Sequence, residues 1–412
     1  MSQRRAFSDL TIVDFTHVLS GPFCTYQLAL LGARVIKVEE PELGDYMRRR
    51  GSDRDLRSKL MGDHFLSLNS NKQSIVIDLH VAEGVEIAQR LISTADVVVE
   101  NFRAGVMDQL GLGFPALSKI NPRLIYCAIS GYGRSGVHRN RKVYDQVVQA
   151  ASGLMSGTGP TDGAPVKSGS PVLDYSSGLM ACFAIAAALF ERSQDGQGQF
   201  IDVSMHDTAL MLMSTGIMNQ MRSGRAPRPH GNDHPLAAAS CYTASDGALI
   251  MLGCCTQSQF ERLCHLVGRP DLAIDPKFCD VNRQDLHRDA LANELQLTLA
   301  TRTAAEWEAL LSDEVPAARV KTLQEGLALA KANERRVVQR IEAPAGLGGA
   351  VDVPVSAFAF ARGGPAIDSF PPFLGEHTER VLRDAGYSEI EIASFKDAGA
   401  VQSWEQDRGV DV

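Results

Sequence analysis

The sequence predicts an α/β fold, in which a large Rossmann-like domain with a parallel sheet is joined by linkers to a smaller α/β domain. The first half of the chain alternates strand-like and helix-like segments, as parallel sheets built from strand–helix–strand units do. Its strand-like segments are nearly continuous apolar runs, as expected for strands covered on both faces. With 412 residues, the chain is long enough for two domains that each bury a core.

The elements of the predicted large domain follow one another at short intervals. Strands are expected at residues 10–15, 34–38, 74–79, 96–100 and 124–130, each rich in apolar residues. Helices are expected at residues 22–31, where Gly32 ends the pattern, and at 82–95, where Val85, Ala88 and Leu91 recur at helical spacing. A further helix is expected at residues 207–223.

Two Gly- and Pro-rich passages mark linkers, at residues 224–235 and 343–354. Between them the patterns predict strands at 240–243 and 248–252 and helices at 257–267, 285–300 and 304–312, and a last helix follows at 376–385. We therefore expect a large domain over residues 1–224, a small domain with its linker over 225–330, and a linker with a C-terminal segment over 331–412.

Composition excludes several classes of function. The net charge of −8 leaves no general basic surface for nucleic acid or anionic lipid. The longest apolar stretch, residues 180–190, is too short to span a bilayer, and the first residues lack the apolar core of a secretory signal. Eight cysteines without a C-x-x-C pair favour free thiols in a reducing cytoplasm and no metal site. A cytoplasmic enzyme is expected.

Asp174 is the most informative residue. An apolar, strand-like run, residues 171–173, brings this carboxylate to the start of a very apolar helix at 179–190. Free N–H groups and the helix dipole favour an ionised side chain at such a position. An ordinary helix N-cap explains the same pattern, and the residues alone leave both readings open.

Seven short segments of the chain resemble, in order and in spacing, the family III CoA-transferases, or CaiB/BaiF group. The segments are residues 14–22, 31–39, 69–75, 99–103, 121–126, 195–199 and 374–378. The resemblance implies that Asp174 is the nucleophile, which carries the acyl group and then CoA. It also implies that CoA thioesters are substrates and not tightly bound cofactors. Finally, it implies that the C-terminal segment returns to the large domain in an interlocked homodimer.

The resemblance also implies a set of residues that contact CoA. Most lie at the ends of expected strands or the starts of helices, where free backbone N–H groups can meet phosphate. They are Val18, Leu19 and Ser20; Asp78, Leu79 and His80; Asn101, Phe102 and Arg103; and Arg139, Lys142, Val143, Tyr144 and Asp145.

The loop after residue 130 is rich in glycine and in positive charge. Gly131, Gly133 and Gly136 match a dinucleotide-binding pattern, but no helix opens directly after them, which argues against NAD or FAD. Five potential cations follow within nine residues: Arg134, His138, Arg139, Arg141 and Lys142. They suit the phosphates of CoA, although a solvated charged surface would show the same pattern.

We therefore expect a CoA-transferase that moves CoA from an acyl-CoA donor to a small carboxylic acid. A 2-methylacyl-CoA racemase-like enzyme and a non-catalytic CoA-binding protein are the alternatives. Racemases of the family have His where this chain has Tyr144, and Tyr is a poor acid–base group near neutral pH. A Gly-rich loop of formyl-CoA transferase has no counterpart at residues 234–240, which argues against the formyl-CoA/oxalate pair. Arg48, Arg49 and Arg50 either meet a dicarboxylate or form an exposed helix face.

Overall fold

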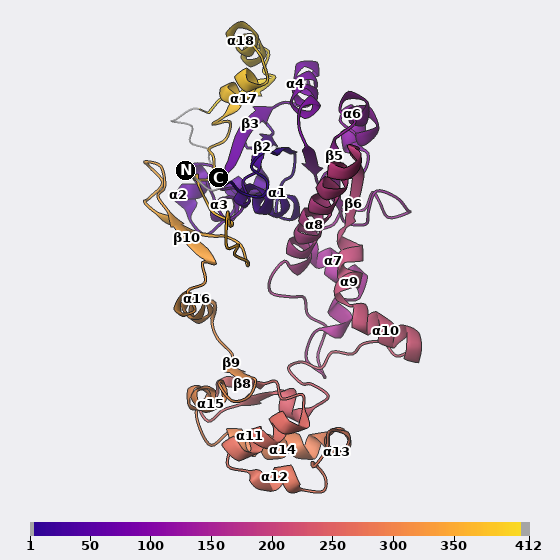
Figure 1. Ribbon diagram of the computed structural model, residues 1–412, viewed down its shortest axis with the longest axis vertical. Coiled ribbons are helices and arrows are strands. Elements are labelled where there is room, and N and C mark those ends of the chain that lie inside the picture. The colour runs from indigo at the N-terminus through magenta and orange to yellow at the C-terminus, as the bar shows by residue number, and fades with distance from the viewer. Residues whose placement is uncertain (1–3, 405–412) are drawn as a thin grey trace. The chain divides into compact units, whose positions relative to one another are not determined.

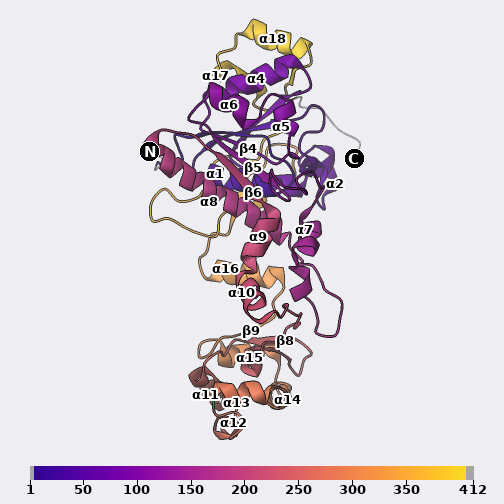
Figure 2. The same ribbon diagram turned by 90° about the vertical axis from the view of Figure 1, so that its right-hand side faces the viewer.

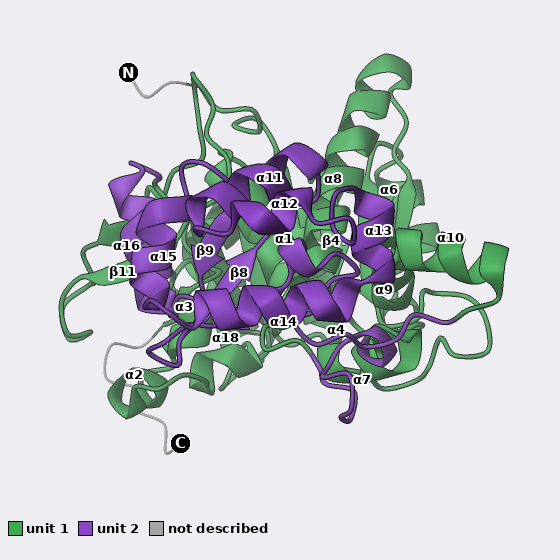
Figure 3. Cartoon of the chain, turned by 90° about the horizontal axis from the view of Figure 1, so that it is seen from below, with its two compact units in different colours: residues 1–154, 168–225, 336–412 green, residues 155–167, 226–335 purple. Residues whose placement is uncertain are grey.

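The computed structural model describes residues 4–404, and the chain divides into two compact units (Figure 3). The first comprises residues 1–154, 168–225 and 336–412, and the second residues 155–167 and 226–335. The sequence placed the changes between domains at 224/225 and 330/331, whereas the units change at 225/226 and 335/336. The short stretch 155–167 belongs to the second unit and has no counterpart among the predicted boundaries.

The first unit is built on a seven-stranded sheet with the order β12-β3-β2-β1-β4-β5-β6 (Figures 1 and 2). Six strands are parallel to their neighbours, and only β12 at the edge is antiparallel. The strands are β1 (Thr11–Asp14), β2 (Arg34–Glu39), β3 (Lys72–Ile77), β4 (Val97–Glu100), β5 (Ile125–Ser130), β6 (Phe200–Ser204) and β12 (Val401–Gln402). The strand order changes direction between β1 and β4, and ligands bind at such switch points in open α/β sheets.

Helices cover both faces of this sheet. On one face, α1 (Ser20–Leu30) and α8 (Val172–Asp195) share a core with Ile12, Val97 and Ile125 of the strands. On the other face, α4 (Ala82–Ser93), α6 (Phe114–Ile120), α17 (Thr378–Asp384) and α18 (Glu389–Asp397) pack against Val13 and Val98. Consecutive strand residues therefore enter opposite cores, which explains the nearly continuous apolar runs.

Several shorter elements complete the first unit. They are η1 (Tyr46–Arg49), α2 (Arg54–Ser58), α3 (Asp63–Leu66), α5 (Val106–Gln109), α7 (Asp145–Ser152), α9 (Met205–Leu212), α10 (Ser214–Ser223), β10 (Val338–Ile341) and β11 (Val351–Pro354). The single helix predicted at 207–223 is in fact two, because the helical hydrogen bonding breaks at Met213. Part of the predicted linker at 343–354 forms β11, which pairs with β10 in an antiparallel hairpin.

The second unit holds a three-stranded antiparallel sheet and its own core. Its strands are β7 (Cys241–Thr243), β8 (Leu249–Leu252) and β9 (Ala317–Arg319). Its helical elements are η2 (Met155–Gly157), η3 (Ala237–Ala239), α11 (Gln257–Leu266), α12 (Pro270–Ile274), α13 (Val281–Leu286), α14 (Arg288–Leu299), α15 (Ala304–Leu311) and α16 (Leu323–Ala332). Phe260, Leu263 and Trp307 lie in the core of this unit.

Helix α8 differs most from its prediction. Residues 171–173 were expected to be strand-like, but the helix already begins at Val172 and runs for 24 residues. By length and mean hydropathy, 1.6 over its most apolar window, α8 would pass for a membrane-crossing helix. One face packs on the sheet and on α1, however, and core helices of globular domains can have the same length and composition.

Candidate active site

A cavity of about 650 Å³ opens at the carboxyl ends of β1, β4 and β5. It contains Asp174 and most of the residues that the sequence assigned to CoA. These are Val18, Leu19 and Ser20 after β1, Asn101, Phe102 and Arg103 after β4, and Arg139, Lys142, Val143 and Tyr144 in the loop after β5. The cavity thus lies beside the change in strand order, where such sheets bind ligands.

Asp78, Leu79 and His80 are not brought to this cavity. They follow β3, which is separated from β1 by β2 in the sheet. The Asp78 carboxylate accepts a hydrogen bond from the backbone N–H of His80 at 2.8 Å, as in an ordinary turn after a strand. Sequence order alone could not show how far β3 lies from β1.

Asp174 is the third residue of α8, one turn later in the helix than an N-cap would be. Ser20 lines the same cavity, and its side chain lies near this carboxylate. Burial and, to a smaller extent, the negative charge of Asp145 together raise the pKa of Asp174 to about 7, while the nearby Ser20 hydroxyl opposes both. A carboxyl group poised near neutral pH in a cavity is a mark of a reactive site.

Asp145 caps the start of α8. Its carboxylate accepts the backbone N–H groups of Leu173 at 2.7 Å and Asp174 at 3.0 Å, and the Gln149 side chain donates to its other oxygen. These N–H groups would otherwise be unpaired at the helix start. Asp145 was expected to contact CoA, but it does not line the cavity and instead holds the start of α8.

Gly178 explains how Asp174 reaches Ser20. A Cβ atom at this position would lie 2.5 Å from the Ser20 carbonyl oxygen, so only glycine lets α8 approach α1 this closely. The two helices make one of the largest contacts in the first unit. The start of α8 is thereby packed against the start of α1.

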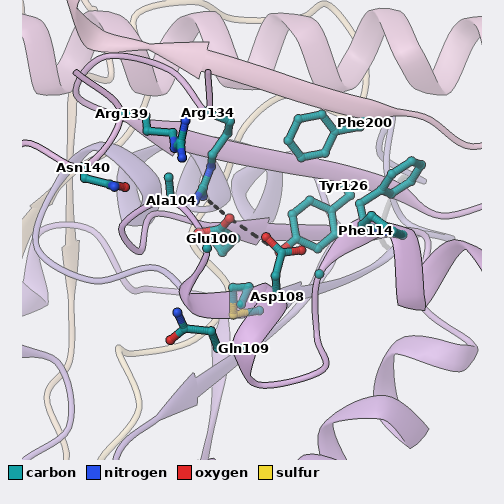
Figure 4. A pocket seen from close by; sticks show the side chains of 14 residues that line it. Glu100, Ala104, Asp108, Gln109, Phe114, Tyr126, Arg134, Arg139, Asn140 and Phe200 are labelled. Carbon is teal, nitrogen blue, oxygen red and sulfur yellow. Dashed lines mark hydrogen bonds and ion pairs between the residues drawn. The ribbon is translucent and has the colours of Figure 1, made fainter. Parts of the chain in front are cut away.

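The cation-rich loop is shared between two cavities. Arg134 forms an ion pair with the buried Glu100, beside a second cavity of about 560 Å³ whose aromatic wall is Phe114, Tyr126 and Phe200 (Figure 4). His138 packs on the ring of Tyr132, with centroids 5.7 Å apart. Of the five cations, only Arg139, Arg141 and Lys142 line the Asp174 cavity.

The three consecutive arginines at residues 48–50 also lie in different surroundings. Arg48 is fully buried, and its Nε and Nη2 atoms each donate to Glu39 at 2.7 Å, so it supports the fold. Arg50 lies over the ring of Tyr46, 4.2 Å from its centroid, and Tyr46 lines the Asp174 cavity. Only the later part of this run therefore borders the candidate site.

His17 and Tyr46 also line the cavity, and the sequence had not assigned them to it. The backbone N–H of His17 donates to the Asn101 side chain at 2.9 Å, and the Asn101 amide returns a bond to the His17 carbonyl at 2.8 Å. Burial lowers the pKa of His17, so the ring is neutral at pH 7. The signal for His17 was available, because it follows the carboxyl end of a predicted strand.

Comparisons with known proteins agree on one family. The sequence profile described as "CoA-transferase family III" matches residues 7–378. The chain is 40% identical to an acetyl-CoA:oxalate CoA-transferase of Acetobacter aceti over 73% of this chain and 77% of that one. It is 32% identical to a succinyl-CoA:glutarate CoA-transferase of Mus musculus, with 96% and 90% covered. A CaiB/BaiF family protein from Brucella suis has a similar crystal structure, with a TM-score of 0.80, 32% identity, and 93% and 100% covered.

Proposed function

Because the chain belongs to CoA-transferase family III and is a CoA-transferase, we propose that it moves CoA from an acyl-CoA donor such as succinyl-CoA to a small carboxylic acid through Asp174. One observation carries the proposal: the Asp174 carboxylate lies in a cavity together with Arg139, Arg141 and Lys142. The cations suit the phosphates of CoA, and the carboxylate suits covalent catalysis.

The proposed reaction consists of four acyl transfers without a net proton change. The Asp174 carboxylate attacks the donor thioester, the C–S bond breaks, and an anhydride and CoA thiolate form. The thiolate attacks the Asp174 carbonyl, which releases the donor acid and leaves CoA as a thioester on the enzyme. The acceptor carboxylate attacks this thioester, and the thiolate then attacks the acceptor carbonyl to give the new acyl-CoA and free Asp174. Together, these four acyl transfers replace one difficult exchange by easier steps.

We propose a short dicarboxylate as the acceptor. Relatives with 31–40% identity are named for oxalate, glutarate and mesaconate, all of which are dicarboxylates. The second carboxylate of such an acid needs a cation, and Arg50 on Tyr46 lies next to the cavity wall. We also propose that CoA thioesters bind and leave as substrates and are not tightly bound cofactors. The enzyme is proposed to be a cytoplasmic homodimer.

One observation favours the racemase alternative. The ring of His17, which burial keeps neutral, lines the same cavity as Asp174, so a second proton-transfer group is present there. A racemase would use Asp174 and this group to remove and return the α-proton while the thioester stays intact. A protein that only binds CoA would do neither this nor the exchange.

One incubation separates these possibilities. Wild-type enzyme and Asp174→Ala are given succinyl-CoA in deuterium oxide, first without an acceptor and then with labelled glutarate, mesaconate or acetate. We expect CoA attached to Asp174 in peptide mass spectra of the wild type, and labelled acyl-CoA with the dicarboxylates. Asp174→Ala should bind CoA but give neither product, because only the nucleophile is lost. Deuterium at the acyl α-carbon without an adduct would instead identify a racemase.

A further inference from the structure

The turn between β1 and α1 contains a strained residue. Val18 has a φ of +71°, in the left-handed region. This region is costly for residues with a Cβ, and most of all for a β-branched side chain. Val18 also lines the cavity that contains Asp174. A strained residue persists only where its surroundings fix it, and such residues concentrate at functional sites.

Asp45 fixes this turn from one side. One of its carboxylate oxygens accepts the backbone N–H of Val18 at 3.1 Å and that of Met47 at 3.0 Å. Its other oxygen lies 2.9 Å from the Lys37 ammonium group, and neither side chain is more than 1% exposed. The Lys37 ammonium also donates to the Thr16 carbonyl at 2.7 Å, so one buried ion pair binds the turn at two points.

Asn101 fixes the residue before Val18 through its two hydrogen bonds to the His17 backbone. The chain then continues from Val18 through Leu19 to Ser20, the first residue of α1. Ser20 lines the cavity together with Asp174, and its hydroxyl lies near enough to lower the pKa of the Asp174 carboxyl group. A rotation at Val18 would therefore move Ser20 relative to Asp174.

We propose that Asp45 is a positioning residue for the transfer reaction: it holds Val18 in the left-handed conformation and thereby places Ser20 against the Asp174 carboxylate. This inference rests on the proposed function, because it assigns a role to Asp45 in the chemistry of Asp174. Stability alone is a weaker explanation of the Lys37–Asp45 pair, since the cost of desolvating two charges offsets much of their attraction. The pair does explain how a valine is kept at a φ that glycine normally adopts.

A rescue experiment tests this role. Asp45→Ala should lower kcat about tenfold to hundredfold per folded enzyme, the scale expected for a misplaced reacting group, while KM for succinyl-CoA changes less than about threefold. The double variant with Val18→Gly should regain at least about a third of the decrease in log kcat, because glycine adopts a φ of +71° without a steric penalty. Asp45→Asn retains the oxygen that accepts the Val18 N–H and should lose less activity than Asp45→Ala.

The matched control is Asp96→Ala at the opposite end of β1. Asp96 also accepts a backbone N–H, from Thr11 at 2.9 Å, and also pairs with a cation, Arg192 at 2.8 Å. Its loss should lower the melting temperature without lowering kcat per folded enzyme. If Asp45→Ala does not fold, an ester bond in place of the Val18 amide removes only the N–H that Asp45 accepts, and the same loss of kcat is expected.

Hydrogen exchange separates this inference from the proposed function. Amides of residues 16–21 should exchange faster in Asp45→Ala than in wild type, and more slowly again when Val18→Gly is added. Unchanged exchange, unchanged kcat, or a loss of kcat that Val18→Gly does not reduce would each overturn the role of Asp45. A wild-type enzyme that transfers no CoA would overturn the proposed function instead, and the exchange measurement would still decide whether Asp45 holds the turn.

Discussion

The surroundings of Asp174 disfavour the charged form that a nucleophile needs. Burial and the nearby Asp145 together raise the pKa of Asp174 to about 7, from an ordinary value of 3.8. The Ser20 hydroxyl works in the opposite direction. The free enzyme at neutral pH therefore contains both the protonated and the ionised side chain, and a bound CoA thioester can meet a carboxylate that is weakly solvated and reactive.

The raised pKa of Asp174 predicts how the stability of the enzyme depends on pH. In the folded state Asp174 keeps its proton up to a pH of about 7, whereas in the unfolded chain it loses the proton near pH 3.8. The free energy of unfolding of the wild type therefore falls as the pH rises between these two values. Asp174→Asn stays neutral throughout. It should therefore unfold at a higher temperature than wild type at pH 8, by a free energy on the order of 4 kcal/mol at most, and at the same temperature at pH 4.

Thermal unfolding at pH 4, 6 and 8 measures this difference. Asp207→Asn is a suitable control, because the Asp207 side chain is 79% exposed and its substitution should give no such trend. The rate of CoA–enzyme adduct formation should rise with pH through about 7 in the wild type, as Asp174 loses its proton. A difference in unfolding temperature that is the same at all three pH values would contradict the assignment of this pKa to Asp174.

The start of α8 shows where local sequence patterns fail. Pro171, Val172 and Leu173 have the composition of a strand, and the sequence placed the helix start after them. In the structure Asp145, which is 28 residues earlier than Leu173, supplies the cap for the first turn. The position of Asp174 in an apolar helix was predictable, but its distance from the helix start depended on a contact that no local pattern contains.

In the loop after β5, the sequence pattern likewise could not show which partner each charged side chain has. The sequence correctly placed a cation-rich loop at the end of a strand, and three of its cations line the Asp174 cavity. It could not show that Arg134 turns to Glu100 instead, because that partner is 34 residues away in the chain and buried at the end of β4. The resemblance implied that Asp78, Leu79 and His80 contact CoA, but they follow β3, which β2 separates from β1, and they do not line the cavity.

This division of the loop predicts unequal effects of neutralising its cations. Arg139→Gln and Lys142→Gln should each weaken CoA binding several-fold, and the remaining affinity should depend less on salt, because a charge that pairs with phosphate is lost. Arg134→Gln should change CoA affinity less than about twofold but lower the melting temperature, because it leaves the buried Glu100 carboxylate without its ion-pair partner. Calorimetric titration with CoA at two salt concentrations measures both. Equal losses of affinity in all three variants would show that Arg134 also binds the ligand.

The architecture of the whole chain was more predictable than its site. The five strands expected in the first half are present as β1 to β5, because buried parallel strands carry an unmistakable apolar pattern. Strand β6, strand β12 and the insertion of residues 155–167 into the second unit were not predicted. Strand β12 is only two residues long and pairs antiparallel to β3, so its short sequence carries no periodicity to detect.

An exposed row of apolar side chains on α8 bears on the assembly of the enzyme. Leu179, Phe183 and Phe190 are 53%, 69% and 71% exposed, and their spacing puts them on one side of the helix. Large aromatic side chains rarely remain this exposed in a monomer and are the main anchors of protein interfaces. The proposed homodimer would bury them against a second copy.

Substitution at Phe183 tests that assembly. Light scattering coupled to gel filtration should give the mass of two chains for the wild type. Phe183→Glu should shift the equilibrium toward the mass of one chain, with dissociation at least about thirtyfold easier, because a central aromatic anchor is lost and a charge is buried without a partner. Ile274→Glu is the matched control: Ile274 is 81% exposed but lies in the second unit, so this variant should remain a dimer. A wild-type mass of one chain, or an unchanged dimer in Phe183→Glu, would show that α8 is not the interface, and its exposed row would then need a different partner.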